Sequence, residues 1–293
     1  MLHKGDILMH SHVAVTITEL HWTPKLVLAI IFVRPLSKNE ELGYFPGNAL
    51  TKERARVCQR LSELARMALD TPALRDAYAA LLAGIRLSAA FDSGKSILVT
   101  SAQPNEGKTT VASCLAITAS LAGQQVLLVD GDLRRPWLAS AAGIVEGIGL
   151  GEILGGQTEA DEAIHPIELF EDSREAGPLS VMASGRRSPA FLPAVDWCKA
   201  RAAFRSFSQR FDIVLLDSPP ILAANDALLL GSVVDALLLV VGAGSAKRDE
   251  VRRAKQQLEA IGTPIIGAVL NQFDPRIHGQ STQPYRDYYL QDH

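Results

Sequence analysis

The chain is poor in cysteine, in aromatic residues and in long apolar runs. Three of its 293 residues are cysteines, and 6% are aromatic. Cys58, Cys114 and Cys198 lie far apart and show neither a Cys-x-x-Cys pattern nor another metal-ligand spacing, so the sequence does not predict a metal cluster. The three cysteines fit small buried residues in a reducing compartment.

Signals for membrane insertion, export and nucleic-acid binding are also missing. The most apolar stretch near the start, Leu26–Val33, is much shorter than the about 20 residues of a spanning helix. Residues 1–23 mix His, Asp, Glu and Thr, whereas an export signal has a basic patch before an apolar run. The net charge of −3 gives no basic footprint for nucleic acid. We therefore expect a cytoplasmic protein without a nucleic-acid partner.

The rest of the composition is that of a globular chain. Hydrophobic residues make up 47% and charged residues 21%, and the length suits one large domain with extensions. Apolar residues recur at helical spacing in Lys52–Leu69 and in Pro72–Leu87, which predicts two amphipathic helices. We expect an N-terminal extension of uncertain order and partly helical over 1–71, a main domain over 72–275, and a flexible tail over 276–293.

After Gly94 the pattern changes to short apolar runs that alternate with helix-like segments. This alternation is typical of βαβ units around a parallel sheet, and continuous apolar runs suit strands buried on both faces. We therefore predict an α/β fold with a mostly parallel sheet and helices on both faces. The predicted strands are Ile97–Thr100, Val126–Val129, Leu179–Met182, Ile213–Leu216, Ala236–Val241 and Ile265–Leu270.

A polar segment with the sequence Gly-Lys-Thr joins the first of these strands to a predicted helix, Thr110–Ala122. Its spacing is that of a phosphate-binding P-loop with Ala102 in place of the first glycine. Lys108 would reach the β and γ phosphates of ATP, and the Thr109 hydroxyl would bind Mg²⁺. A chance match in a solvated turn is the alternative. The predicted ATP-binding residues here are Ala102, Gln103, Pro104, Asn105, Glu106, Gly107, Lys108, Thr109 and Thr110.

The strand Val126–Val129 is followed by two acids, Asp130 and Asp132. Acids at a buried strand end need a cation nearby, and the magnesium of a P-loop site supplies one. One acid would order the metal's waters, while the other would accept a proton from an attacking hydroxyl. A capped turn with solvated acids is the alternative. The next residues, Arg134 and Arg135, are candidates for binding phosphate or an acidic partner.

The strand Ile213–Leu216 also ends in an acid, Asp217, which has the form of a Walker B residue that holds magnesium through water. Asp212 precedes the apolar run, and we interpret it as a strand-start residue only. The predicted metal ligands are Thr109, Asp132 and Asp217.

The sequences of these motifs resemble those of the bacterial tyrosine kinase family. The members of this family are the cytoplasmic kinase modules of capsule and exopolysaccharide assembly. The resemblance spans about Pro72–Pro275 and implies a P-loop NTPase fold with ATP-dependent protein-tyrosine kinase activity, chiefly autophosphorylation. The related MinD and ParA ATPases carry a signature lysine at the position of Gln103, which disfavours that branch. The matching segments are Thr100–Thr110, Val129–Pro136, Leu216–Pro220 and Asn225–Ala227.

The resemblance also implies residue roles. By position, Asn271 resembles the adenine-contacting asparagine of this superfamily, with a strand-end cap as the alternative. Three of the five tyrosines lie in the last nine residues, which fits the family's C-terminal cluster that neighbouring subunits phosphorylate in trans. A docking patch is the alternative for this cluster. The implied catalytic residues are Lys108, Asp130, Asp132 and Asp217, and the implied autophosphorylation sites are Tyr285, Tyr288 and Tyr289.

One departure concerns the helix before the first predicted strand. Family members carry Glu, Arg and Arg at three-residue spacing there, and these residues contact the neighbouring active site and build a ring. The comparable residues are Asp76, Ala79 and Leu82, so the sequence does not predict the ring, although Arg75 and Arg86 could replace the arginines. Simple packing of this helix on the sheet is the alternative.

The resemblance implies activation by a membrane polysaccharide co-polymerase on a separate chain. It follows that the protein would lie at the inner face of the plasma membrane as a peripheral component. Two other functions stay open. One is a MinD/ParA-like switch ATPase that hydrolyses ATP without labelling itself, and the other is a non-catalytic nucleotide-binding scaffold for the co-polymerase.

Overall fold

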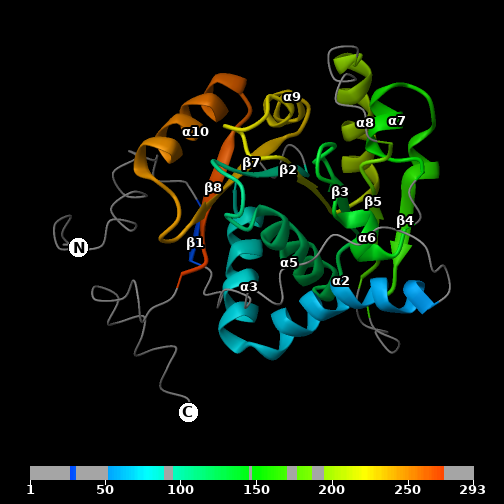
Figure 1. Ribbon diagram of the computed structural model, residues 1–293, viewed down its shortest axis with the longest axis horizontal. Helices are drawn as coiled ribbons and strands as arrows, with labels where there is room; N and C mark the ends of the chain where they lie inside the picture. The colour runs from blue at the N-terminus through cyan, green and yellow to red at the C-terminus, as the bar shows by residue number, and fades with distance from the viewer. Residues whose placement is uncertain are drawn as a thin grey trace.

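The computed structural model describes residues 27–30, 52–88, 95–144, 147–169, 177–186 and 195–273, with side chains from residue 60 onward. In this part of the chain the strands form one sheet, and helices cover both of its faces (Figure 1). The mostly parallel α/β fold that the sequence predicts is therefore confirmed.

The sheet of the described residues has eight strands in the order β1-β8-β7-β2-β6-β3-β5-β4. Neighbouring strands are parallel except β4, which runs antiparallel to β5. Because parallel strands end at one edge, the loops after the central strands β2, β6 and β3 lie side by side. The strands are β1 Val27–Ile30, β2 Ser96–Ser101, β3 Val126–Asp130, β4 Ile164–Ile167, β5 Leu179–Met182, β6 Ile213–Asp217, β7 Ala236–Gly242 and β8 Ile265–Asn271.

The helices form two layers. Helices α2, α3, α5 and α6 pack on one face of the sheet, and α7, α8, α9 and α10 pack on the other (Figure 1). The helices are α2 Lys52–Asp70, α3 Pro72–Arg86, α5 Lys108–Leu121, α6 Leu138–Ala142, α7 Leu150–Leu154, α8 Trp197–Arg210, α9 Asp226–Gly231 and α10 Arg248–Ile261, with a 3₁₀ turn, η1, at Ala160–Ala163.

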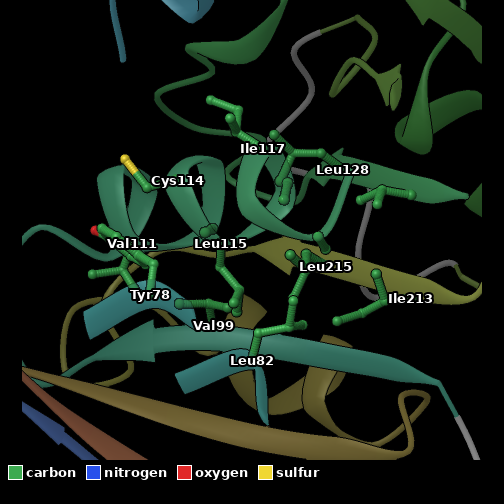
Figure 2. Packing of buried hydrophobic residues seen from close by; sticks show 14 of the residues in the cluster. Tyr78, Leu82, Val99, Val111, Cys114, Leu115, Ile117, Leu128, Ile213 and Leu215 are labelled. Carbon is green, nitrogen blue, oxygen red and sulfur yellow. The ribbon is translucent and has the colours of Figure 1, made fainter. Parts of the chain in front are cut away.

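Each central strand contributes side chains to both layers. In β2, Ile97 and Val99 pack in the core under α3 and α5, whereas Leu98 packs in the core under the other layer. Figure 2 shows the first core, where Tyr78 of α3 lies beside Val111 and Cys114 of α5. Burial on both faces explains why these strands are uninterrupted apolar runs in the sequence.

The six predicted strands and the three predicted helices are all present, with ends that differ by at most two residues. The largest difference is at α5, which begins at Lys108 and not at Thr110. Two strands were missed. β1 is four residues long and is defined by its pairing with β8. β4 contains Pro166 and lies at the sheet edge, where a strand tolerates proline.

Helix α2 shares the core of the sheet. Leu61, Ala65 and Ala68, spaced at three and four residues, are buried in the same cluster as Leu81 of α3. The segment 1–71 therefore contributes core residues to the fold. The division at residues 71 and 275 remains a prediction, and residues 276–293 lie outside the described part of the chain.

No helix in the described ranges is long and apolar enough to cross a membrane.

We predict that Leu61→Ala lowers the free energy of unfolding by about 2 to 5 kcal/mol, because the Leu61 side chain is 1% exposed in the shared core. Urea unfolding of the full chain would measure this. The matched control is Arg66→Ala on the exposed side of the same helix, for which we expect a change within about 0.5 kcal/mol. Equal effects of the two substitutions would show that α2 is not part of the cooperative fold.

Candidate active site

The P-loop, residues 102–109, joins β2 to α5 near the centre of the sheet (Figure 1). Two of its residues have left-handed backbone, Asn105 with φ 66° and Gly107 with φ 87°. Gly107 is the N-cap of α5, and no side chain caps this helix end. The first amides of α5 therefore have no capping acceptor, which is the arrangement that binds anions at helix N-termini.

The Glu106 side chain turns back into the loop. Its Oε2 accepts a hydrogen bond from the Gln103 amide at 3.0 Å, and the residue is 2% exposed. Burial raises the pKa of Glu106, and the backbone amides that its carboxylate accepts oppose this shift. The Glu106 side chain thus bonds within the P-loop itself. Of this predicted ATP-binding residue, only the backbone amide is free to face phosphate.

Asp217, at the end of β6, lies next to the start of α5. Burial raises the pKa of Asp217 to about 7, against the lowering effects of the Lys108 ammonium and of a hydrogen bond from Thr109. The Asp130 carboxylate raises it further. Asp217 Oδ1 is buried and has no hydrogen-bond partner among the described residues. The sequence prediction that Lys108, Thr109 and Asp217 meet is consistent with this arrangement.

Asp130 is opposite Asp217 in the register of β3 and β6. Its Oδ2 accepts the amides of Trp137 and Leu138, each at 2.9 Å, and its Oδ1 accepts the Asp132 amide at 3.2 Å. Burial raises the pKa of Asp130 to about 6, and these amides hold it lower than it would otherwise be. Asp130 therefore anchors the acid loop, residues 131–137, and the start of α6.

Asp132 is the more accessible of the two acids, 8% exposed against 1% for Asp130. Its Oδ1 accepts the amides of Arg134 and Arg135 at 3.2 and 2.9 Å. The two acids are therefore not solvated, and their positions differ. The Asp130 carboxylate is buried under the loop, whereas the Asp132 carboxylate lies nearer its surface.

Gly131, between the two acids, allows β3 and β6 to stay paired up to their ends. Its N–H donates to the Asp217 carbonyl at 2.8 Å. A Cβ at this position would lie 2.5 Å from that oxygen and 2.9 Å from Leu216 Cδ1, distances that real Cβ atoms do not show. Any larger residue would push the ends of β3 and β6 apart. This steric requirement is the reason for glycine here, and sequence reasoning missed it.

An ion pair fixes the acid loop to α9. Arg134 Nε donates to Asp226 Oδ2 at 2.7 Å, and Arg134 Nη2 donates to Asp226 Oδ1 at 3.1 Å. The Asp226 side chain is 4% exposed and the Arg134 side chain 47%. Arg134 therefore has a partner within the fold, which removes it as a free phosphate ligand. Asp226 appeared in the sequence only as part of Asn225–Ala227, without a role.

The oxygen ligands at this edge fit Mg²⁺. The described residues contain no group of three or more His, Cys, Asp or Glu that could hold a metal alone. Magnesium, however, usually binds one or two carboxylates together with phosphate oxygens and water. The partnerless Asp217 Oδ1 and the nearby Thr109 hydroxyl are hard oxygen donors of this kind. They are compatible with magnesium brought by a nucleotide.

The remaining predicted site residues divide into two groups. Asn271, at the end of β8, is buried behind the P-loop, where its amide donates to the Glu106 carbonyl. Tyr285, Tyr288 and Tyr289 lie outside the described residues, so the predicted phosphorylation sites remain predictions.

A strand, a phosphate loop and an uncapped helix, flanked by strands that end in acids, define the class of P-loop nucleotide-binding proteins. Residues 97–291 match the family of CobQ/CobB/MinD/ParA nucleotide binding domains. The chain is 34% identical over 178 residues to the tyrosine-protein kinase YwqD of Bacillus subtilis, which covers 60% of this chain and 72% of that protein. The chain belongs to the bacterial tyrosine-protein kinases within this nucleotide-binding family.

Solved structures agree on the fold. The kinase domain of the tyrosine kinase ETK of Escherichia coli is similar with a TM-score of 0.70 and 24% identity, over 89% of this chain and 94% of that one. MinD of Pyrococcus horikoshii complexed with Mg-ADP is similar with a TM-score of 0.53 and 21% identity, over 67% of this chain and 76% of that one. At these identities the similarity concerns the fold alone. The two matches confirm the P-loop NTPase fold.

We predict that the protein without magnesium and nucleotide loses stability as the pH rises from about 4 to about 8. Both Asp130 and Asp217 have a pKa above the unfolded value of about 3.9, so the folded state binds more protons over this range. Their stabilising contribution is complete below the unfolded pKa and is lost as the pH passes about 6 and about 7. Urea unfolding in the presence of a chelator at several pH values would measure this slope.

Asp217→Asn should flatten this pH dependence, because the substituted group no longer titrates. Asp70→Asn, at the exposed end of α2, is the control for the same substitution outside the site. A wild-type stability that rises steadily over the same pH range would contradict the raised pKa values.

We also predict that Arg134 and Asp226 stabilise the fold jointly. A double-mutant cycle of Arg134→Met and Asp226→Asn should give a coupling energy of about 1 to 2 kcal/mol, because the pair is bidentate and one partner is buried. The control cycle is the exposed pair Arg252 and Asp249, for which we expect at most about 0.5 kcal/mol. Strict additivity at Arg134 and Asp226 would contradict the anchoring of the acid loop.

Proposed function

We propose that this chain is an ATP-dependent protein-tyrosine kinase that phosphorylates tyrosines of its own C-terminal segment. The observation that carries the proposal is the meeting of the P-loop residues Lys108 and Thr109 with two buried strand-end acids, Asp217 and Asp130. Membership of the bacterial tyrosine-protein kinases supplies the reaction class.

The P-loop and the start of α5 bind the nucleotide. Amides of the loop and of the first turn of α5 donate to the phosphate oxygens, and the Lys108 ammonium contacts the β and γ phosphates. Thr109, Asp132 and Asp217 would hold Mg²⁺, which would neutralise charge on the phosphates. The partnerless Oδ1 of Asp217 supports its place in this set. Asn271 is the further predicted nucleotide contact.

The acid pair moves the proton. The phenol oxygen of a tyrosine attacks the γ phosphorus, its proton passes to a carboxylate, and the bond from the γ phosphorus to the bridging oxygen breaks to release ADP. Asp130 is the proposed acceptor, because Asp132 and Asp217 are assigned to the metal and burial raises the pKa of Asp130 to about 6. Its Oδ1 accepts the Asp132 amide at 3.2 Å, the longest of its three hydrogen bonds, and is the proposed proton-accepting atom.

A switch ATPase is the second candidate function. The fold similarity to MinD favours it, since such a protein also needs Lys108, Thr109 and Asp217. Gln103 stands against it, because the MinD and ParA branch carries a signature lysine there. The switch ATPase would release phosphate and leave the tyrosines unlabelled.

We further propose a membrane polysaccharide co-polymerase as the activating partner, with the kinase in the cytoplasm at the inner face of the membrane. Polysaccharide synthesis as the regulated process rests on the family resemblance. A homo-oligomer is the remaining proposal. On α3, Asp76 and Ala79 are exposed and available to a second copy, whereas Leu82 is buried in the core and is not.

Incubation of the purified chain with labelled ATP and magnesium should label Tyr285, Tyr288 or Tyr289, as mapped by mass spectrometry. Lys108→Met should reduce the label at least about 100-fold, because it removes the cation that stabilises charge on the γ phosphoryl group in the transition state. Lys199→Met on the exposed side of α8 is the control for the same substitution and should keep full activity.

Hydrolysis of ATP without tyrosine label, in the presence of the co-polymerase's cytoplasmic segment, would contradict the kinase function and support the switch ATPase. Nucleotide binding with neither reaction would leave the scaffold function.

A further inference from the structure

Asn271, the last residue of β8, and Gln272, which follows it, both reach the back of the P-loop. Asn271 Nδ2 donates to the Glu106 carbonyl at 2.9 Å, and Gln272 Nε2 donates to the Asn105 carbonyl at 3.0 Å. Two consecutive side chains therefore bind two consecutive carbonyls of a loop that is more than 160 residues away in the sequence.

These carbonyls belong to the peptide units whose N–H groups are those of Glu106 and Gly107. In a trans peptide unit the C=O and the N–H point in opposite directions. Holding both carbonyls toward β8 therefore turns the two amides away from β8, to the other side of the loop. A row of amides that point into one concave side is how a P-loop binds phosphate.

The fit behind the loop is close. A Cβ on Gly107 would overlap the Asn271 amide, so this contact requires glycine, and the left-handed backbone at 107 favours glycine independently. Asn271 is 2% exposed, and its Oδ1 is buried without a partner among the described residues.

The geometry at Gln272 indicates that its position is imposed by its surroundings. Its backbone is left-handed, with φ 59°, which is unfavourable for a residue other than glycine. The preceding carbonyl, of Asn271, accepts the Ala243 amide at 2.8 Å, which fixes the end of β8 against the end of β7. A Cβ on Gly242 would lie 3.2 Å from Gln272 Oε1, so the Gln272 amide lies directly over this glycine.

We propose that Asn271 and Gln272 are positioning residues that hold the Glu106 and Gly107 amides toward the phosphates, and that they thereby set the affinity for polyphosphate. The inference rests on the proposed nucleotide site and is separate from the adenine contact that the family resemblance implies for Asn271. It assigns Gln272 a role that no sequence motif indicates.

The test compares two ligands that differ by the nucleoside. Isothermal titration calorimetry with magnesium would measure the dissociation constants of ATP and of inorganic tripolyphosphate for the full chain. Gln272→Met keeps the side-chain length and removes the donor. We expect it to weaken both ligands by the same factor, about fivefold to tenfold, which is the effect of one lost hydrogen bond. Asn271→Ala should also weaken tripolyphosphate, because it removes the hydrogen bond to the Glu106 carbonyl.

Two controls separate positioning from general damage. Gln209→Met makes the same substitution on the exposed side of α8 and should change neither dissociation constant. The unfolding midpoint of each variant without ligand should stay close to the wild-type value for Gln272→Met, whose hydrogen bond lies at the surface. If Asn271→Ala fails to fold, Gln272→Met decides the test alone.

Three outcomes would overturn the inference. Loss of ATP affinity with unchanged tripolyphosphate affinity would support only the adenine contact for Asn271. Unchanged affinity of Gln272→Met for both ligands would remove the positioning role while leaving the nucleotide site intact. Binding of neither ligand by the wild-type chain would overturn the proposed function, and with it this inference.

Discussion

The site depends on two buried carboxylates that parallel pairing brings side by side. Asp130 and Asp217 end neighbouring strands in register, and both are almost fully buried. Burial removes the hydration of both carboxylates, which is the main reason why the pKa of each is raised, and the Asp130 carboxylate raises the pKa of Asp217 further. The Lys108 ammonium makes the ionised state of Asp217 more favourable, and a divalent cation would do so further. The paired ends of β3 and β6 therefore favour the binding of positive charge next to the start of α5.

The loops around these carboxylates are held by partners far away in the sequence. Asp130 caps the backbone at the start of α6, Asp226 holds Arg134, and the end of β8 holds the back of the P-loop. Each contact fixes backbone that would otherwise be free to rotate, and a fixed donor or acceptor loses less entropy when it binds phosphate. The precision of the site thus comes from neighbouring strands and helices more than from the loops themselves.

The sequence predicts the elements of this fold well because the central strands are buried on both faces and appear as plain apolar runs. It does not predict β1 or β4, since a four-residue strand is defined by its neighbour and β4 carries a proline. The motif acids were found because each follows an apolar run. Contacts such as those of Asp226 and Gln272 were not found, because their partners are more than 90 residues away and only strand order brings them together.

Strand order also bears on how tyrosines reach the site. Gln272 lies against the P-loop, and Tyr285 follows it by 285 − 272 = 13 residues. A chain of that length spans at most about 45 Å when extended. Gln272, where it starts, is within hydrogen-bond distance of the P-loop. The described part of the chain therefore ends beside the back of the P-loop. The 13 residues are long enough for Tyr285 to reach the proposed nucleotide site of its own chain. On the proposed function, a phenol connected in this way would have a high local concentration at the γ phosphate, so its phosphorylation would not require the ring for which Ala79 and Leu82 lack the arginines.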